Sequence, residues 1–177
     1  GAATATLTVS GGLFTVTAGG TFTLASQSGG GSASGTLNLY GGAFTCNADI
    51  RDGGSNSTST LTLAGGTLDM TGHAIGPAAQ RVDVFTARSG TLMNLGQLNS
   101  GAPLVKTGVG TLVLSGTNTY SGATIVSNGT LRLTGPTSLP LSTAMYLITG
   151  VTAHLDFIGT QTVHSVFING VPKPAGV

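Results

Sequence analysis

Few side chains in this 177-residue sequence could do chemistry, and the best candidates fall into three small groups. Each group places a carboxylate beside a basic side chain: Asp49, Arg51 and Asp52; Asp69 and His73; His154 and Asp156. Polysaccharide hydrolases and lyases use clustered carboxylates of this kind for acid–base catalysis. The chain has only five acids, all Asp, and they would have to converge through the way the chain coils. We therefore expect solvated surface pairs, no catalytic residue and no enzymatic activity.

One loop offers a candidate ion site, because Asp49 to Asn56 contains two carboxylates and several carbonyls that could bind Ca²⁺. It lacks the alternating Asp spacing of an EF-hand and the Gly-Gly-x-Gly-x-Asp nonapeptide, so a plain polar loop is the favoured interpretation. The three His residues and Cys46 are too dispersed for a zinc site. We expect no metal and no cofactor.

The elements that position these side chains are copies of one sequence motif, Thr-Leu-x-(Leu/Val)-x-Gly, which is called the repeated phrase below. Its copies begin at five positions: Thr6, Thr36, Thr60, Thr111 and Thr130. Alternating apolar residues before a glycine predict a short strand with one buried face, followed by a turn. Repetition at intervals of roughly 20 to 30 residues is typical of a solenoid.

The first two units align at a constant offset, with Leu7 matching Leu37 and Val16 matching Cys46. A Gly-Gly pair follows the phrase in both, which predicts two short strands joined at a glycine corner. Cys46 is therefore expected to be a small buried residue rather than a nucleophile. The first leucine of each of the five copies is predicted to point into the core and to occupy the equivalent position in its coil: Leu7, Leu37, Leu61, Leu112 and Leu131.

The composition excludes several function classes. Charged residues are 6% of the chain, whereas roughly 25% is usual, and the hydrophobic fraction of 40% argues against disorder. Glu is absent and β-branched residues abound, so we expect an all-β fold with almost no helix. The net charge is +1 without a basic run, which disfavours nucleic acid. Apolar stretches are shorter than the roughly 18 residues of a membrane helix, so we expect no membrane insertion.

A longer pattern extends from Leu104 to Leu131 and reads LVKTGVGTLVLSGTNTYSGATIVSNGTL. It resembles the autotransporter-associated β-strand repeat, approximately L-x-K-x-G-x-G-T-L-x-L-S-G-x-N-T-Y-x-G-x-T-x-V-x-x-G-T-L. Leu61 to Gly76 is similar to flanking coils, and Phe167 to Gly176 to a terminal segment, of the same proteins. The resemblance implies a right-handed parallel β-helix in a large bacterial protein that is extracellular or on the cell surface. It implies no catalytic residues.

We therefore predict one β-solenoid segment of a larger protein, residues 1–177, with roughly seven or eight coils. Its expected parts are N-terminal coils with Gly-Gly corners at 1–76, irregular coils at 77–100, the repeat at 101–135 and C-terminal coils at 136–177. At about 4.8 Å per coil, the rod would be about 35 to 40 Å long. Within 77–100 we expect a strand at Arg81–Arg88, and a distorted coil rather than a helical turn around Leu95.

The predicted function is structural, as a stalk, filament, or surface or matrix component. The alternative is an adhesin that binds glycans or cell-surface proteins through the corner loops Ala25–Ser34 and Asp49–Ser59. A polysaccharide lyase or hydrolase is the third hypothesis. The uncharged strand Ala2–Ser10 has no block against edge pairing, so the expected partners are further repeats of the same protein, or other copies in a filament.

Overall fold

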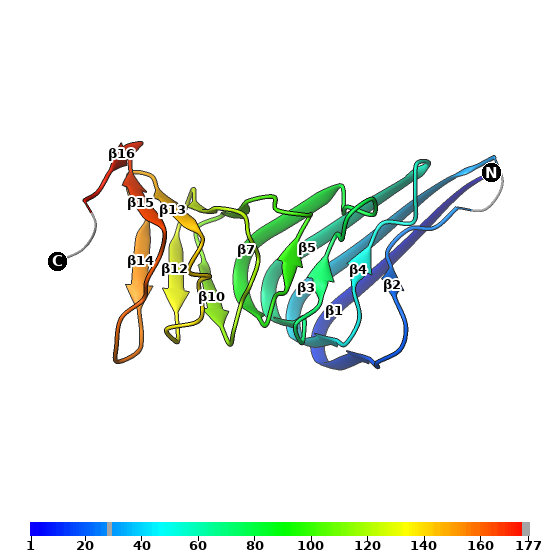
Figure 1. Cartoon of the computed structure of the whole chain (residues 1–177). Coiled ribbons are helices and arrows are strands. Elements are labelled where there is room, and N and C mark those ends of the chain that lie inside the picture. The colour runs from blue at the N-terminus through cyan, green and yellow to red at the C-terminus, as the bar shows by residue number, and fades with distance from the viewer. Residues whose placement is uncertain (28–29, 175–177) are drawn as a thin grey trace.

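The computed structural model describes residues 1–27 and 30–174, and every regular element in this part is a β-strand (Figure 1). Four long strands alternate with four short ones: β1 Ala2–Val16, β2 Phe22–Thr23, β3 Ser32–Cys46, β4 Ile50–Arg51, β5 Ser57–Asp69, β6 Ala74–Ile75, β7 Val84–Met93 and β8 Gln97–Leu98. Eight shorter strands follow: β9 Leu104–Lys106, β10 Thr111–Ser115, β11 Thr124–Val126, β12 Thr130–Leu133, β13 Ala144–Leu147, β14 Thr152–Leu155, β15 Ser165–Ile168 and β16 Val171–Pro172.

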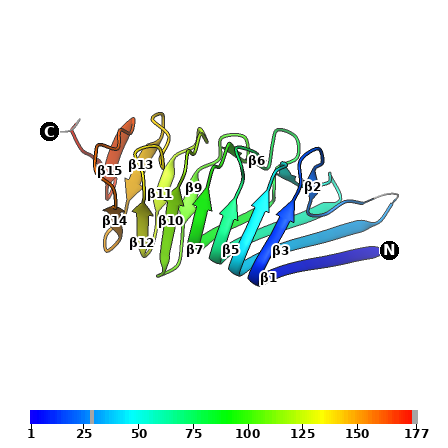
Figure 2. The same ribbon diagram turned by 90° about the horizontal axis from the view of Figure 1, so that it is seen from below.

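The strands stack in parallel into a solenoid with three sides (Figures 1 and 2). The first side contains β1, β3, β5, β7, β9, β11, β13 and β15 in chain order. The second side consists of the C-terminal halves of the four long strands, continued by β10, β12 and β14. A separate sheet of β2, β4, β6 and β8 forms the third side. Eight first-side strands correspond to seven complete coils and the start of an eighth, which confirms the predicted all-β solenoid.

The corner between the first and second sides requires glycine. Gly42 has φ of +65°, and a Cβ there would lie 2.6 Å from the carbonyl carbon of Gly11 in the coil before. Gly66 has φ of +64° and would meet Gly41 at the same distance. A side chain would therefore be strained by the backbone conformation and would clash with the neighbouring coil. This is the physical basis of the Gly-Gly corner.

Inward-facing apolar side chains form two long rows along the solenoid, and those of the second row are buried except at its ends, where Phe14 is 38% and Leu155 57% exposed. The first-side row is Leu7, Leu37, Leu61 and Phe85. The second-side row is Phe14, Phe44, Leu68, Leu92, Leu114, Leu133 and Leu155. Each row crosses several coils, so the core is one continuous apolar column.

The five repeated phrases point inward as predicted, but they do not fill one row. Leu37, Leu61, Leu112 and Leu131 are all 0% exposed, and Leu7 is half-buried in the first coil. Leu112, however, lies beside Gly90 on the second side, and Leu131 stacks on Leu112. The prediction of a single role was therefore wrong. Alternation is the same on both sides, so the phrase by itself does not specify which side it occupies.

The segment around Leu95 is a turn between β7 and β8, not a helix. Leu92, Leu95 and Leu98 are buried, and the corner residues Asn94 and Asn99 have positive φ. This agrees with the predicted distorted coil. The strand expected at Arg81–Arg88 begins later, with β7 at Val84.

Candidate functional site

The first candidate group is divided between different contacts. Asp49 Oδ1 accepts the backbone N–H of Ala74 at 2.8 Å and lies 3.6 Å from His73 Nδ1. Arg51 contacts neither acid of its group, because its Nη1 donates to Gln80 Oε1 at 2.6 Å. Arg51, which was grouped with Asp49 in the sequence, therefore has a different partner. The basic side chain next to Asp49 is His73 of the following coil.

Asp52 is used to close its own loop. It is 7% exposed, and its Oδ2 accepts the N–H of Gly54 at 2.9 Å and the hydroxyl of Ser57 at 2.7 Å. Its Oδ1 is buried without a hydrogen-bond partner among residues 1–27 and 30–174. A carboxylate that folds its own loop in this way supports the polar-loop interpretation of the Asp49–Asn56 segment.

Asp69 does not meet His73, although four residues separate them. Its Oδ1 accepts the N–H of Thr71 and the Nδ2 amide of Asn94, both at 2.9 Å. The fourth acid, Asp83, accepts the backbone N–H of Ser59 at 2.7 Å from the preceding coil. Both carboxylates therefore connect neighbouring coils.

The third group lies on the exposed second side near the C-terminal end. Arg132 donates a hydrogen bond to Asp156, and the bond together with the charge of Arg132 lowers the pKa of that carboxyl. The nearby His154 lowers it further and is the register partner of Arg132 on the adjacent strand. An acid held ionised on an open surface is poorly suited to donate a proton.

The three groups lie on different coils, and within the described part of the chain no three His, Cys, Asp or Glu side chains are arranged so that they could hold a metal ion. That part also contains no helix long and apolar enough to cross a membrane. The absence of catalysis and of a bound metal remains a prediction. Cys46 is fully buried in register with Val16, as expected, and its Sγ donates to the Ala48 carbonyl at 3.2 Å.

The most unusual polar residue, Lys106, was not singled out by the sequence reasoning. Its side chain is 0% exposed and lies in register between Ala87 and Val126. The ammonium Nζ donates to the carbonyls of Thr107 and Gly108 at 2.7 Å and of Asn128 at 3.0 Å, and burial lowers the pKa of the amine. The signal was present, because alternation after the buried Leu104 places Lys106 on the inner face.

Asn118 is a second buried polar residue, and it ties three coils together. Its Oδ1 accepts the N–H of Leu95 at 2.8 Å, and its Nδ2 donates to the carbonyl of Ser138 at 2.8 Å. Tyr120, also buried, shares a 2.7 Å hydrogen bond with the Thr124 hydroxyl. These polar groups face the interior, where Asn118 pairs with backbone atoms and Tyr120 with a buried hydroxyl, and they are not accessible to a substrate.

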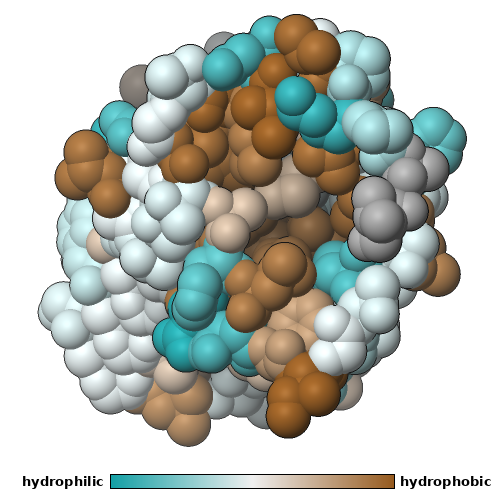
Figure 3. Space-filling view, turned by 90° about the vertical axis from the view of Figure 1, so that its left-hand side faces the viewer, coloured by the Kyte–Doolittle hydropathy of each residue, from teal (hydrophilic) through white to brown (hydrophobic). Residues whose placement is uncertain are grey.

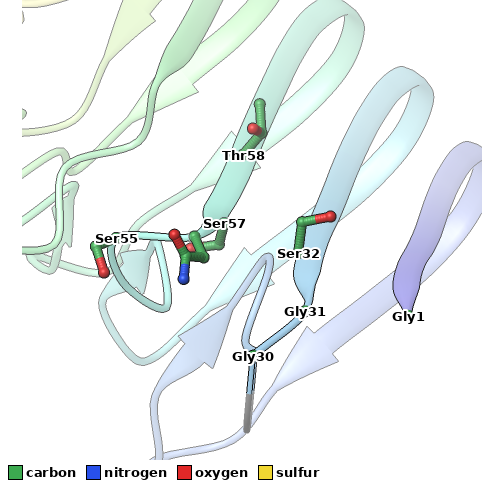
Figure 4. A pocket seen from close by; sticks show the side chains of 8 residues that line it. Gly1, Gly30, Gly31, Ser32, Ser55, Ser57 and Thr58 are labelled. Carbon is green, nitrogen blue, oxygen red and sulfur yellow. The ribbon is translucent and has the colours of Figure 1, made fainter.

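The two corner loops predicted as adhesin sites lie next to each other. A cavity of about 620 Å³ is lined from neighbouring coils by Gly1, Gly30, Gly31, Ser32, Ser55, Asn56, Ser57 and Thr58 (Figure 4). Its lining side chains are hydroxyls and one amide, with no charged or aromatic group. The cavity therefore offers hydrogen bonding but no ring on which a sugar could stack.

Aromatic rings on the outer face of the first side do not supply that ring either. Tyr146 and Phe167 stack with centroids 4.6 Å apart and planes 6° apart. Because they belong to adjacent strands, their faces point along the solenoid and only their edges point to solvent. Such a pair stabilises the stack and is a poor platform for a flat ligand.

Residues 104–133 match the family model described as the passenger-associated-transport-repeat. No curated protein and no solved structure matches the chain. The matched residues extend from β9 to β12 and include Lys106, Asn118 and Tyr120. A repeat of this family implies a bacterial surface or secreted protein.

Proposed function

Because residues 104–133 make this chain an autotransporter passenger repeat protein, we propose that it serves as a stiff structural section of an extracellular stalk or filament. The observation that carries the proposal is the unbroken parallel stacking from β1 to β15 over one continuous core. We also propose that it has no enzymatic activity, since each of its carboxylates already has a structural partner.

Stiffness follows from the way the coils are joined. Each coil pairs its backbone with both neighbours, and successive coils are about 4.8 Å apart. Bending the rod would open strand pairs on its outer side, and side chains such as Asn118 and Lys106 add hydrogen bonds between coils. The rod lengthens by adding coils, without any change to its cross-section.

Deleting a whole coil tests this function. Thr111 and Thr130 are register partners, so removing residues 111–129 removes one turn and leaves the strands in line. With fluorophores on Ala18→Cys and Thr160→Cys, the distance between the two ends should shorten by about 4.8 Å, the spacing of one coil. Deleting residues 111–120 is the control, because half a coil destroys the register and should unfold the segment. An unchanged end-to-end distance in the folded whole-coil variant would contradict the proposal.

A second candidate function is adhesion, which is favoured by one observation: the cavity where the two corner loops meet. Ser32 and Asn56 line it and could hydrogen-bond to a glycan. If the chain is an adhesin, a glycan array should show a ligand whose binding is lost in Asn56→Ala and kept in Asn169→Ala. An array without any ligand would leave only the structural function.

A further inference from the structure

The four long strands carry rows of threonines on the outer face of the first side. The leading threonine of the repeated phrase precedes an inward leucine, so alternation turns it to solvent, together with the residues two positions before and after it. These outward positions form three rows along the solenoid, which we call the threonine face: Thr4, Ser34 and Thr58; Thr6, Thr36, Thr60 and Val84; Thr8, Asn38, Thr62 and Thr86.

The threonine face is a regular lattice. Eight threonines and one serine occupy its eleven positions, and the register shifts of the flanking strand pairs begin only after Val9 and Leu63, beyond the rows. The strands that carry the rows lie side by side (Figures 1 and 2). Adjacent strands are about 4.8 Å apart, and alternate residues along one strand are about 6.6 Å apart. Hydroxyl groups therefore repeat in two directions at nearly constant spacing.

These hydroxyls are available to a partner. Thr58 and the threonines of β1 are exposed, and the other hydroxyl side chains of the face are half-buried. Ser59 points inward and donates its hydroxyl to Asp83, whereas the nine outward hydroxyls have no hydrogen-bond partner among residues 1–27 and 30–174. The branched Cβ of threonine restricts χ1, so the hydroxyls are held in place with little further loss of entropy on binding.

The threonine face is also uncharged, and none of its eleven positions carries an aromatic ring. Tyr40 and Arg88 are the next outward residues, at the corner beyond Asn38 and Thr86. The inward leucines between the rows, such as Leu37 and Leu61, are 0% exposed, so the lattice lies on a packed core. A fixed, neutral surface of hydroxyl and methyl groups results.

The other faces do not continue this lattice. Outward residues of the second side include Leu13, Asp69 and Met93 beside threonines. On the first side beyond β7, the outward residues are apolar: Val105, Ile125, Tyr146 and Phe167. Figure 3 looks onto the C-terminal end and shows strongly hydrophobic and hydrophilic side chains close together there. The hydroxyl lattice is therefore confined to one face of the first four coils.

Only a partner with a repeating surface gains from such a lattice. One hydroxyl exchanges one water for another at little net gain, but fixed hydroxyls act together when the partner repeats at the same spacing. The two repeats of the threonine face are close to the spacings of water oxygens in the surface planes of ice, and liquid water has no such fixed repeat. Crystalline polysaccharides also repeat, but this face has no ring on which their sugars could stack.

We propose that the threonine face binds ice. The hydroxyls hold water molecules at the spacing of the crystal, and the methyl groups between them remove apolar surface from liquid water. A chain fixed to ice in this way stops growth of the crystal where it is bound. The binding uses only the outward positions of the strands, so it is independent of the proposed structural function.

Thermal hysteresis, the gap between the freezing and melting temperatures of one ice crystal, tests the proposal on the full chain. The parent should show a gap and faceted crystals. Thr36→Tyr should reduce the gap at least fivefold, because a ring at the centre of the face keeps ice away from the surrounding hydroxyls. Thr67→Tyr is the matched control, since Thr67 points outward on the second side, and it should leave the gap unchanged.

Folding of each variant is checked by thermal unfolding, and Thr58→Tyr at an exposed position replaces Thr36→Tyr if the latter does not fold. A folded parent without a gap would overturn the proposal, as would equal loss of the gap in Thr36→Tyr and Thr67→Tyr. Sedimentation that depends on concentration and is abolished by Thr36→Tyr, with no gap in the parent, would assign the face to a second copy of the chain. Binding to cellulose or chitin without a gap would assign it to a polysaccharide.

Discussion

Replacing Leu112 with Asp would test the inward assignment of the repeated phrase most directly. The Leu112 side chain is 0% exposed and lies between Gly90 and Leu131 of the neighbouring coils. Losing the buried Leu costs about 2–5 kcal/mol by analogy with Leu→Ala. The new carboxylate would have no partner there, which adds a desolvation penalty or forces it to remain protonated with a raised pKa. The expected loss of stability at pH 7 is therefore at least about 3 kcal/mol.

Thermal unfolding followed by circular dichroism measures this loss. At about 2–4 °C per kcal/mol for a chain of this size, the melting temperature should fall by at least about 6–12 °C. Leu13→Asp is the matched control, because Leu13 is 71% exposed and the same substitution there should cost little. The loss of stability caused by Leu112→Asp should be smaller at acid pH. A buried carboxyl with a raised pKa is protonated there, and its neutral form costs less to bury than the carboxylate. Equal melting of the Leu112 variant and the parent would refute the inward assignment.

Three further predictions concern the other polar side chains. Lys106→Met should destabilise the chain by about 1–3 kcal/mol at pH 7, because three carbonyls lose their donor. Burial lowers the pKa of Lys106 below 10.5, so between the folded and unfolded values the unfolded chain binds more protons. The stability of the parent relative to this variant should accordingly rise with pH in that window, and a fall there would be inconsistent with a buried ammonium. Cys46, whose pKa burial raises to about 11, should react with a thiol reagent only on denaturation; rapid labelling of the folded chain would place it outside the core. The chain should not cleave acidic polysaccharides, and turnover abolished by Asp49→Asn or Asp156→Asn would show that it is an enzyme.

The fold was predictable because alternation and glycine corners are local properties. Leu37 and Leu61 are buried where the pattern places them, and Cys46 lies in register with Val16. The contacts of the candidate sites were not predictable, because they depend on the length of each coil. His73 meets Asp49, which lies 24 residues before it, rather than Asp69, which lies four before it. Sequence proximity cannot replace the coil length that sets such neighbours.

Coil length also explains why the polar residues of the matched repeat face inward. Register partners are 24 residues apart at Thr36 and Thr60, but 19 apart at Thr111 and Thr130. The third-side sheet ends at β8, within the described part of the chain, so in the shorter coils that follow the backbone there needs other partners. Asn118, in one of these shorter coils, donates to the carbonyl of Ser138 in the next coil and accepts the N–H of Leu95 in the coil before. The polar side chains of the matched repeat therefore hold short coils together, as the proposed structural function requires.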